Sequence, residues 1–487
     1  MQASQAPSRV CTFPILYVHI PSLFVYHSLH YLVYLLPTFL SATAKASLTP
    51  FEQVAFTSYG AQSKRQRRLL HKALGAPTIP SYHPFLLTET RSFLRRLIVS
   101  PSSYTRHIRR YAGGLTLSVI YGYEVVRDGP ADDAQDAAVS SSSKAGNNSA
   151  VPNAGKPQPE VDDMLALAEE CVGILSNKVA AGGGIWAVDV FPSLQRLPAW
   201  LPGMGWKTDS AKWKKRMEEF VDRPYEYVKM SMKSGNYKPS FCSTLLADTS
   251  MHGSDREEFE FDLKWSANSM YSASLDTTIT TVAHFMLAMM LNPGLLRRAQ
   301  GEIDEVVGSD RLPTFSDREN LPYIECIFKE SLRWGVPVPL NLPHRLMEDD
   351  IYNGMFIPKG SLVFGNIWAM MRDENVYENP EAFIPERFLE SVSPEEERRR
   401  DPKNFVFGFG RRLCPGENLV DSSIWVLIAS MIATLDISKA VDEHGNVIEP
   451  KVDFGNPIFR IPDQFKCDMR PRSPKALSLI QGMDIPL

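Results

Sequence analysis

One cysteine of this chain, Cys414, stands in a glycine-rich turn beside two arginines. Residues 407–416 read FGFGRRLCPG. The thiolate is the form of cysteine that binds metals, and nearby cations and backbone N–H groups stabilise it. Gly410 and Gly416 would allow the tight turn that aims those N–H groups at the sulfur. Residues 417–428 read as a helix whose N-terminal dipole would also favour the thiolate. The pattern indicates a metal-binding thiolate, with a buried structural cysteine as the alternative.

This segment resembles the haem-binding loop of the cytochrome P-450 superfamily. It matches the pattern Phe-x-x-Gly-x-Arg-x-Cys-x-Gly at every fixed position. The resemblance implies that Cys414 is the axial iron ligand of haem b, whose thiolate pushes electron density onto iron to favour O–O cleavage. It also implies that Phe407 packs near the sulfur. Arg412 would meet a haem propionate as a charge-assisted pair.

A second motif lies in residues 261–291, which we expect to form the longest helix. Residues 273–278 read ASLDTT, so an acid stands beside hydroxyls in an apolar stretch, which is costly unless something polar faces it. The motif resembles the family's oxygen-activation motif, which implies that Asp276 supplies protons and Thr277 hydrogen-bonds bound oxygen. Ser274 replaces the family's glycine, and we expect the oxygen groove to survive because serine is small. The alternative is that these hydroxyls bond back to helix carbonyls.

Two further basic positions resemble residues that hold haem propionates in the family. Residues 58–73 read as a short helix with a basic face, which alone would be an ordinary solvated face. The resemblance implies that Arg67 is the arginine of the family's Trp-x-x-x-Arg pair, although Ser63 replaces the tryptophan. His344 would reach a propionate, with a plain turn histidine as the alternative.

Three charged residues resemble the family's structural network beneath the haem. Glu330 and Arg333 stand three residues apart on a predicted helix over 321–334, which alone would be an ordinary surface pair. They match the family's Glu-x-x-Arg pair, and Arg387 would be the third member. Removing one partner of such a buried network should cost about 3 to 5 kcal/mol.

Length and composition allow a large buried core. The chain has 487 residues, of which 44% are hydrophobic and 22% charged, and its net charge of -4 gives no indication of nucleic-acid binding. Six scattered cysteines without a CxxC pair favour a reducing compartment. The resemblance implies one haem-thiolate domain over residues 51–487, mainly α with small β-sheets. Its haem would lie between the long central helix and the cysteine loop. Residues 129–160 are of low complexity and predict a disordered loop.

The N-terminal region, residues 1–50, is atypical. Residues 10–44 contain no charged side chain, and the apolar stretch 13–40 is long enough to cross a bilayer, although prolines and histidines interrupt it. We interpret it as a membrane-associated segment, with an apolar segment packed on the body as the alternative. The resemblance begins only near residue 59, which motivates the hypothesis of a haem-poor, inactive family member.

The substrate pocket can be outlined only by position. Three residues of the long helix, Tyr271, Ser272 and Leu275, would line it together with residues 336–340 and 457–461. Most of these are apolar, so a lipophilic small molecule is favoured. Arg460 would either bind a carboxylate or face solvent.

The resemblance implies a monooxygenase that uses O2 and electrons from NADPH. NADPH-cytochrome P-450 reductase would deliver the electrons, with cytochrome b5 as an optional second donor. A basic patch would dock the acidic surface of the reductase; its residues would be Lys64, Arg65, Arg68 and Arg411. The protein would lie on the endoplasmic reticulum membrane with its catalytic domain facing the cytosol. Fungal secondary metabolism of terpenoids, polyketides or indoles is expected, with an isomerase or dehydratase as the alternative.

Overall fold

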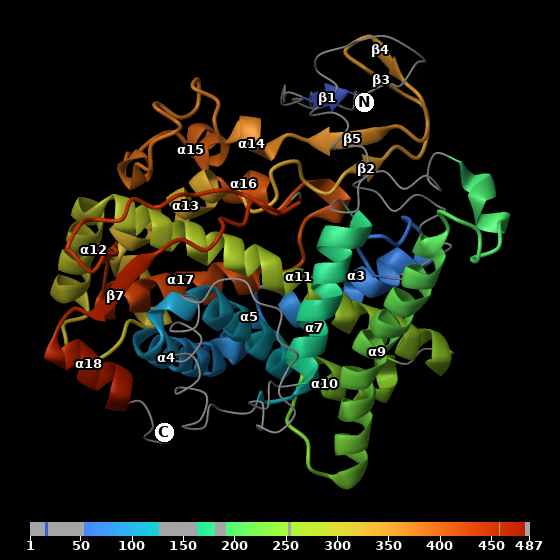
Figure 1. The fold of residues 1–487 in the computed structure, drawn as a ribbon, viewed down its shortest axis with the longest axis horizontal. Helices are drawn as coiled ribbons and strands as arrows, with labels where there is room; N and C mark the ends of the chain where they lie inside the picture. Colours follow the sequence, from blue (N-terminus) through green and yellow to red (C-terminus); the bar gives the residue numbers. More distant parts are fainter. Residues whose placement is uncertain are drawn as a thin grey trace, which may run out of the picture.

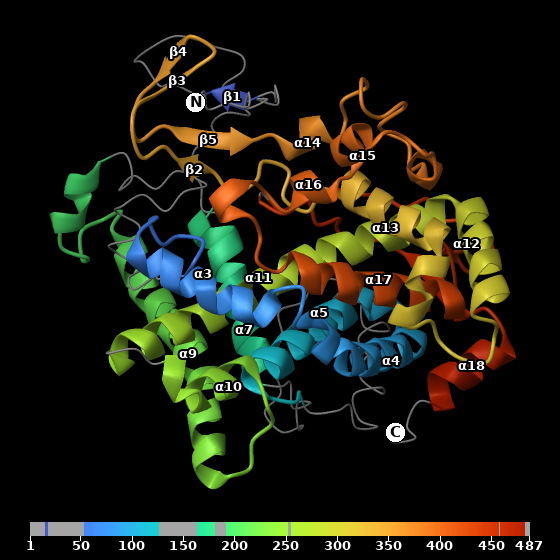
Figure 2. The same ribbon diagram turned by 180° about the vertical axis from the view of Figure 1, so that it is seen from behind.

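The computed structural model describes residues 53–125, 163–180, 191–251, 255–456 and 458–482, together with the backbone of residues 15–17. Within these ranges the chain is mainly helical, with three small antiparallel sheets. Figures 1 and 2 show the sheet that contains β5 at one end of the molecule, above the helical layers. The predicted fold class is therefore confirmed. The predicted loop over 129–160 lies outside the described residues.

The long helix α11 (Arg256–Leu291) crosses the middle of the molecule (Figures 1 and 2). It begins earlier than the predicted 261–291, because the Asp255 side chain caps it by accepting a hydrogen bond from the Glu258 N–H. It ends at Leu291, and its C-cap Asn292 stands directly before Pro293, which cannot continue the hydrogen-bond ladder. Its most apolar window is long enough to cross a membrane, but 78% of that window is buried inside the protein, as in a core helix.

The other helices surround α11. Those that contact it include α5 (Tyr104–Tyr121), α13 (Pro322–Gly335), α3 (Ala61–Leu74) and α17 (Glu417–Thr434). The remaining helices are α4 (His83–Val99), α7 (Asp163–Ile174), α9 (Gly205–Ser234), α10 (Phe241–Ala247), α12 (Pro293–Val306), α14 (Ile367–Met370), α15 (Pro394–Arg400), α16 (Lys403–Val406) and α18 (Pro474–Gln481). The predicted helices over 58–73 and 321–334 correspond to α3 and α13 within a few residues.

The strands form three separate sheets. In the first, β5 (Leu362–Gly365) lies between β1 (Ile15–Tyr17) and β2 (His344–Arg345). The second is a hairpin of β3 (Asp350–Tyr352) and β4 (Met355–Ile357). In the third, β6 (Leu435–Lys439) pairs with β7 (Cys467–Pro471).

Strand β1 comes from the N-terminal stretch that the sequence predicts to be membrane-associated. Its three residues pair antiparallel with β5, with Leu16 opposite Phe364. The other residues of 1–50 lie outside the described part of the chain. Membrane association of this segment therefore stays a prediction, now with three of its residues placed on the body of the protein.

Candidate functional site

The cysteine loop is closed by its own backbone. The Cys414 N–H donates to the Phe407 carbonyl at 2.8 Å, so Phe407 contacts the cysteine through its backbone. Gly408 and Gly410 have φ values of 81° and 57°, in the left-handed region that glycine adopts readily. Gly416 has an ordinary φ of -84°, so the backbone conformation there does not require glycine. A Cβ on Gly416 would lie 3.7 Å from the Cys414 sulfur, so this residue faces the thiol directly.

The Cys414 thiol is placed in an environment with opposing effects. Burial raises its pKa, and the nearby Glu417 carboxylate adds to that rise. The backbone N–H groups of Gly416 and Glu417 and the charge of Arg67 lower it. Since burial is the largest cause, the predicted N–H groups are present but do not by themselves outweigh desolvation. A bound cation would be needed to hold the thiolate.

Two arginines and one histidine gather beside this loop from three different elements. Arg67 of α3 donates to the Leu413 carbonyl at 2.5 Å. Arg412 donates to the carbonyls of Val54 and Thr57 at 3.1 and 2.7 Å. His344, in β2, lies close enough to Arg412 for that charge to lower its pKa, after the larger effect of burial. We call Arg67, Arg412 and His344 the cationic group, after its two arginines. All three side chains are only partly exposed.

The cationic group lacks a matching carboxylate. Among the described residues, no ion pair joins Arg67, Arg412 or His344 to an Asp or Glu. Burial lowers the pKa of Arg412, and the charge of Arg67 lowers it further. Partly buried cations without an anion are unfavourable, so this arrangement fits a dianionic ligand such as a haem with two propionates. The chain thus offers one thiol, two guanidinium cations and one histidine to such a group.

The rest of a metal's coordination would have to come from outside the protein. In the described part of the chain, no three His, Cys, Asp or Glu side chains are arranged to hold a metal ion. A metal bound at Cys414 would need ligands that a macrocycle such as haem provides.

The predicted oxygen-activation motif lies on α11, and its side chains point in different directions. Ala273 is exposed although most of the surrounding helix is buried, so it faces open space. The Thr277 hydroxyl donates to the Ala273 carbonyl at 2.8 Å, which is the back-bonding considered above as the alternative. The Asp276 carboxylate accepts a hydrogen bond from the Ser176 hydroxyl at 3.1 Å. Burial raises the pKa of Asp276, while Ser176 and the charge of Arg109 lower it.

Ser274, in the family's glycine position, is turned toward α5. Its Oγ lies 2.8 Å from the Thr116 hydroxyl and donates to the Tyr271 carbonyl at 3.0 Å. The added side chain is therefore accommodated between helices α11 and α5, and survival of the oxygen groove stays a prediction.

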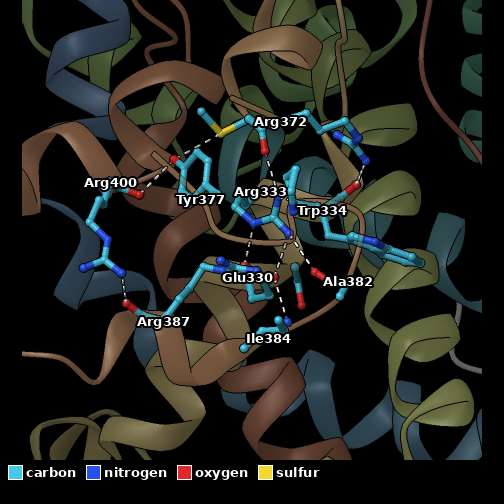
Figure 3. Close-up of polar contacts among 12 residues, drawn as sticks. Glu330, Arg333, Trp334, Arg372, Tyr377, Ala382, Ile384, Arg387 and Arg400 are labelled. Carbon is cyan, nitrogen blue, oxygen red and sulfur yellow. Dashed lines mark hydrogen bonds and ion pairs between the residues drawn. The ribbon is translucent and has the colours of Figure 1, made fainter. Parts of the chain in front are cut away.

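The structure brings the three predicted network residues together in the protein interior (Figure 3). Arg333 donates to both carboxylate oxygens of Glu330 at 2.7 Å, and both side chains are fully buried. Arg387 approaches Glu330 at 3.4 Å and donates to the Glu378 carbonyl at 2.9 Å. The Ile384 N–H donates to Glu330 at 2.9 Å, so the carboxylate is surrounded by donors. We call Glu330, Arg333 and Arg387 the neutralised network, because the Glu330 carboxylate pairs with both arginines, although the three side chains together keep one net positive charge.

The predicted basic docking patch is only partly available. Arg65 pairs with Glu258 and Asp262 of α11 at 2.9 and 2.6 Å, so its charge is compensated. Lys64 and Arg411 lie over the Tyr59 ring and are exposed. Arg68 is exposed as well. The patch is therefore best described by Lys64, Arg68 and Arg411.

The predicted pocket residues include two on α11, Tyr271 and Leu275, and one near the C-terminus, Arg460. Tyr271 and Leu275 are buried, and the Tyr271 hydroxyl donates to the Met164 carbonyl at 3.1 Å, so Tyr271 is fixed against α7. Arg460 lies 2.7 Å from Nε2 of His284, a histidine that sequence reasoning missed. Burial lowers the pKa of His284 to about 3, so this ring is neutral and accepts from Arg460. Arg460 is engaged within the protein rather than free in solvent.

Comparisons with known proteins agree with this site. The family model described as cytochrome P-450 matches residues 185–460. Cytochrome P-450 monooxygenase claT of Ampulloclitocybe clavipes is 38% identical over 88% of this chain and 78% of that protein. Cytochrome P-450 monooxygenase 176 of Postia placenta is 36% identical over 88% and 75%. A zebra fish cytochrome P-450 structure with progesterone has a TM-score of 0.63 and 20% identity, and the match covers 90% of this chain and 89% of that one.

The solved structure supports the fold, and the fungal relatives support the enzyme class. The similarity to these relatives extends over most of the chain, and the family model covers the cysteine loop. The chain therefore belongs to the cytochrome P-450 family and is a cytochrome P-450 monooxygenase.

Proposed function

We propose that this chain binds haem b through Cys414 and hydroxylates or otherwise oxidises a lipophilic small molecule. The observation that carries the proposal is the partly buried Cys414 thiol beside two guanidinium groups, Arg67 and Arg412, that pair with no carboxylate in the described part of the chain. Arg67, Arg412 and His344 would hold the propionates, and the loop of Phe407, Gly410 and Gly416 would enclose the thiolate. When bound, the haem supplies oxygen activation and the transfer of one oxygen atom to substrate.

Two side chains on α11, Asp276 and Thr277, would donate protons and bind water across the site from Cys414. Burial raises the pKa of Asp276, so this carboxyl retains a proton to a higher pH than a solvated aspartate. Ser176 hydrogen-bonds this carboxyl and fixes its orientation. The Thr277 hydroxyl is held by the Ala273 carbonyl, and its oxygen remains able to accept a second hydrogen bond. This acid and hydroxyl favour oxygenation over the isomerase or dehydratase alternative.

The partners and location follow from the same reading. Electrons from NADPH would arrive through NADPH-cytochrome P-450 reductase, with cytochrome b5 as an optional second donor, at the patch of Lys64, Arg68 and Arg411. The apolar segment within residues 1–50 would attach the protein to the endoplasmic reticulum membrane, with the domain of residues 51–487 facing the cytosol. The sequence resemblance suggests a role in fungal secondary metabolism, on a terpenoid, polyketide or indole substrate, and the relatives compared above are fungal monooxygenases.

A carbon-monoxide difference spectrum of the reduced protein tests this proposal. We expect the Soret shift typical of a thiolate-ligated haem in the unmutated chain and its loss in Cys414→Ala. An unmutated chain that retains no haem, or shows no such shift, would support the haem-poor alternative. Product analysis with a reductase and candidate lipophilic substrates would then separate oxygenated products from isomerised or dehydrated ones.

A further inference from the structure

A short segment with three buried residues, Gln53, Val54 and Thr57, lies between the two sides of the site. Residues 53–57, which we call the strap, precede α3 and connect α11 with the cysteine loop. Gln53 and Val54 are each 4% exposed. A glutamine at this level of burial requires hydrogen-bond partners for its amide. The strap is therefore expected to make specific hydrogen bonds through Gln53, although its place in the sequence gives no indication of them.

On one side the strap is attached to α11. The Gln53 amide nitrogen lies 2.9 Å from the Asn268 side-chain oxygen and 3.1 Å from the Ser272 hydroxyl. Asn268 is fully buried, and its own amide nitrogen donates to the Phe220 carbonyl, so its oxygen is presented to Gln53. The Val54 N–H donates to the Ser269 hydroxyl at 2.9 Å.

On the other side the strap holds Arg412. The carbonyls of Val54 and Thr57 accept from the two terminal nitrogens of this guanidinium at 3.1 and 2.7 Å. The strap is also closed on itself, because the N–H groups of Phe56 and Thr57 donate to the Gln53 carbonyl at 2.9 and 3.0 Å. Val54 thus uses its N–H toward α11 and its C=O toward the cysteine loop.

This geometry constrains how Arg412 can meet an anion. A guanidinium carries five N–H donors in a rigid plane. The strap occupies two of the donors of Arg412, which fixes the orientation of that plane and leaves three donors for another acceptor. The position of Arg412 therefore depends on how firmly the strap is attached to α11.

We propose that Gln53 is a positioning residue that sets the orientation of Arg412 toward a haem propionate, by attaching the strap to Asn268 and Ser272 of α11. The inference rests on the proposed haem-binding function. Gln53 makes no contact with Arg412 itself; it acts through the carbonyls of Val54 and Thr57. Its predicted effect is on haem retention and propionate geometry, with activity affected only as a consequence.

The test uses two variants of the attachment and one matched control. Gln53→Leu removes the amide, and Ser269→Ala is a milder change that removes the acceptor of the Val54 N–H. Gln300→Leu is the control, because Gln300 is 8% exposed and its amide nitrogen donates to Leu435 and Asp436 at 3.1 Å, in the α12–β6 region. Haem transfer to excess apomyoglobin and the resonance Raman propionate bending modes would be measured for each reconstituted protein.

We expect Gln53→Leu to release haem about tenfold faster than the unmutated protein, as for a lost buried hydrogen bond near 1.4 kcal/mol. Ser269→Ala should change haem release in the same direction by a smaller factor. Both should shift the propionate modes. Gln300→Leu should lower the thermal midpoint while leaving haem release and these modes unchanged.

A double variant and the parent spectrum separate the possible failures. Gln53→Leu and Ser269→Ala both act through the strap, so their effects should not be independent. The double variant should release haem more slowly than the product of the two single-variant factors predicts. Release rates and propionate modes of Gln53→Leu that equal those of Gln300→Leu would overturn the inference while leaving the proposed function intact. Absence of a thiolate-type spectrum in the unmutated protein would instead overturn the proposed function, and with it the basis of this inference.

Discussion

The neutralised network and the cationic group are two clusters of buried or half-buried charge with opposite designs. Glu330 receives donors from Arg333, Arg387 and the backbone, so the network is complete within the protein. Arg67 and Arg412 donate only to backbone carbonyls in the described part of the chain. The first cluster needs nothing from outside, whereas the second is balanced only when an anion binds. A structural charge cluster and a ligand-binding one can therefore be distinguished by whether the cluster contains a carboxylate that pairs with its cations.

The largest effect should come from breaking the neutralised network. Glu330→Gln would leave the fully buried Arg333 without its carboxylate, and we expect the apoprotein to lose about 3 to 5 kcal/mol of unfolding free energy. Urea unfolding followed by circular dichroism would measure this loss. Glu449→Gln, which removes an exposed partner of Lys439, is the control and should cost less than about 1 kcal/mol. Equal losses in the two variants would contradict the distinction.

The second prediction concerns the cationic group. Arg412→Gln should cost the apoprotein less stability than Glu330→Gln does, because the loss of hydrogen bonds to Val54 and Thr57 is partly offset by relief of repulsion with Arg67. Haem affinity should fall by about ten- to a hundredfold, as for a lost charge-assisted hydrogen bond. Haem titration of the apoprotein and urea unfolding would measure the two quantities. A variant that unfolds as readily as Glu330→Gln while keeping haem affinity would show that Arg412 is structural.

The third prediction concerns the hydrogen bond between two uncharged side chains, Ser274 and Thr116, whose loss should cost less stability. Ser274→Gly removes the hydrogen bond to Thr116 and places a glycine in the α11 interior, so the protein should lose about 1 kcal/mol. Because the Ser274 side chain faces α5, the carbon-monoxide complex should form with an unchanged spectrum. Thermal unfolding and that spectrum test both statements, and an altered spectrum would show that Ser274 shapes the oxygen groove.

The smallest effect should be a dependence of stability on pH. Burial and the charge of Arg412 lower the pKa of His344, so the unfolded chain binds its proton more readily than the folded protein does. His344 therefore costs no stability above the ordinary histidine pKa of about 6.5, and stability is lost as pH falls below it. His344→Gln should remove this part of the acid sensitivity of the apoprotein. Parallel unfolding curves at pH 7.5 and pH 5.5 would show it, and an unchanged difference between the two would contradict it.

The sequence predicted the fold class and most site positions because local patterns carry them. Three signals each lie within one continuous stretch of sequence: the spacing in residues 407–416, the Glu-x-x-Arg pair and the apolar stretch of α11. What it missed depends on long-range contacts. Gln53 meets residues 215 or more positions away, and the role of an isolated glutamine cannot be inferred from its neighbours. Arg65 was predicted to belong to a docking surface. Its ion-pair partners Glu258 and Asp262 also lie far away in the sequence, so the local pattern could not reveal them.

The strap also bears on the order in which the protein is assembled. One residue, Val54, connects the helix on one side of the site with the loop on the other. The strap joins the two sides of the site at one edge, so entry of haem through that edge requires residues 53–57 to open. The rate of haem uptake by this route would then be governed by that opening. Hydrogen exchange at the Val54 amide would report that opening directly.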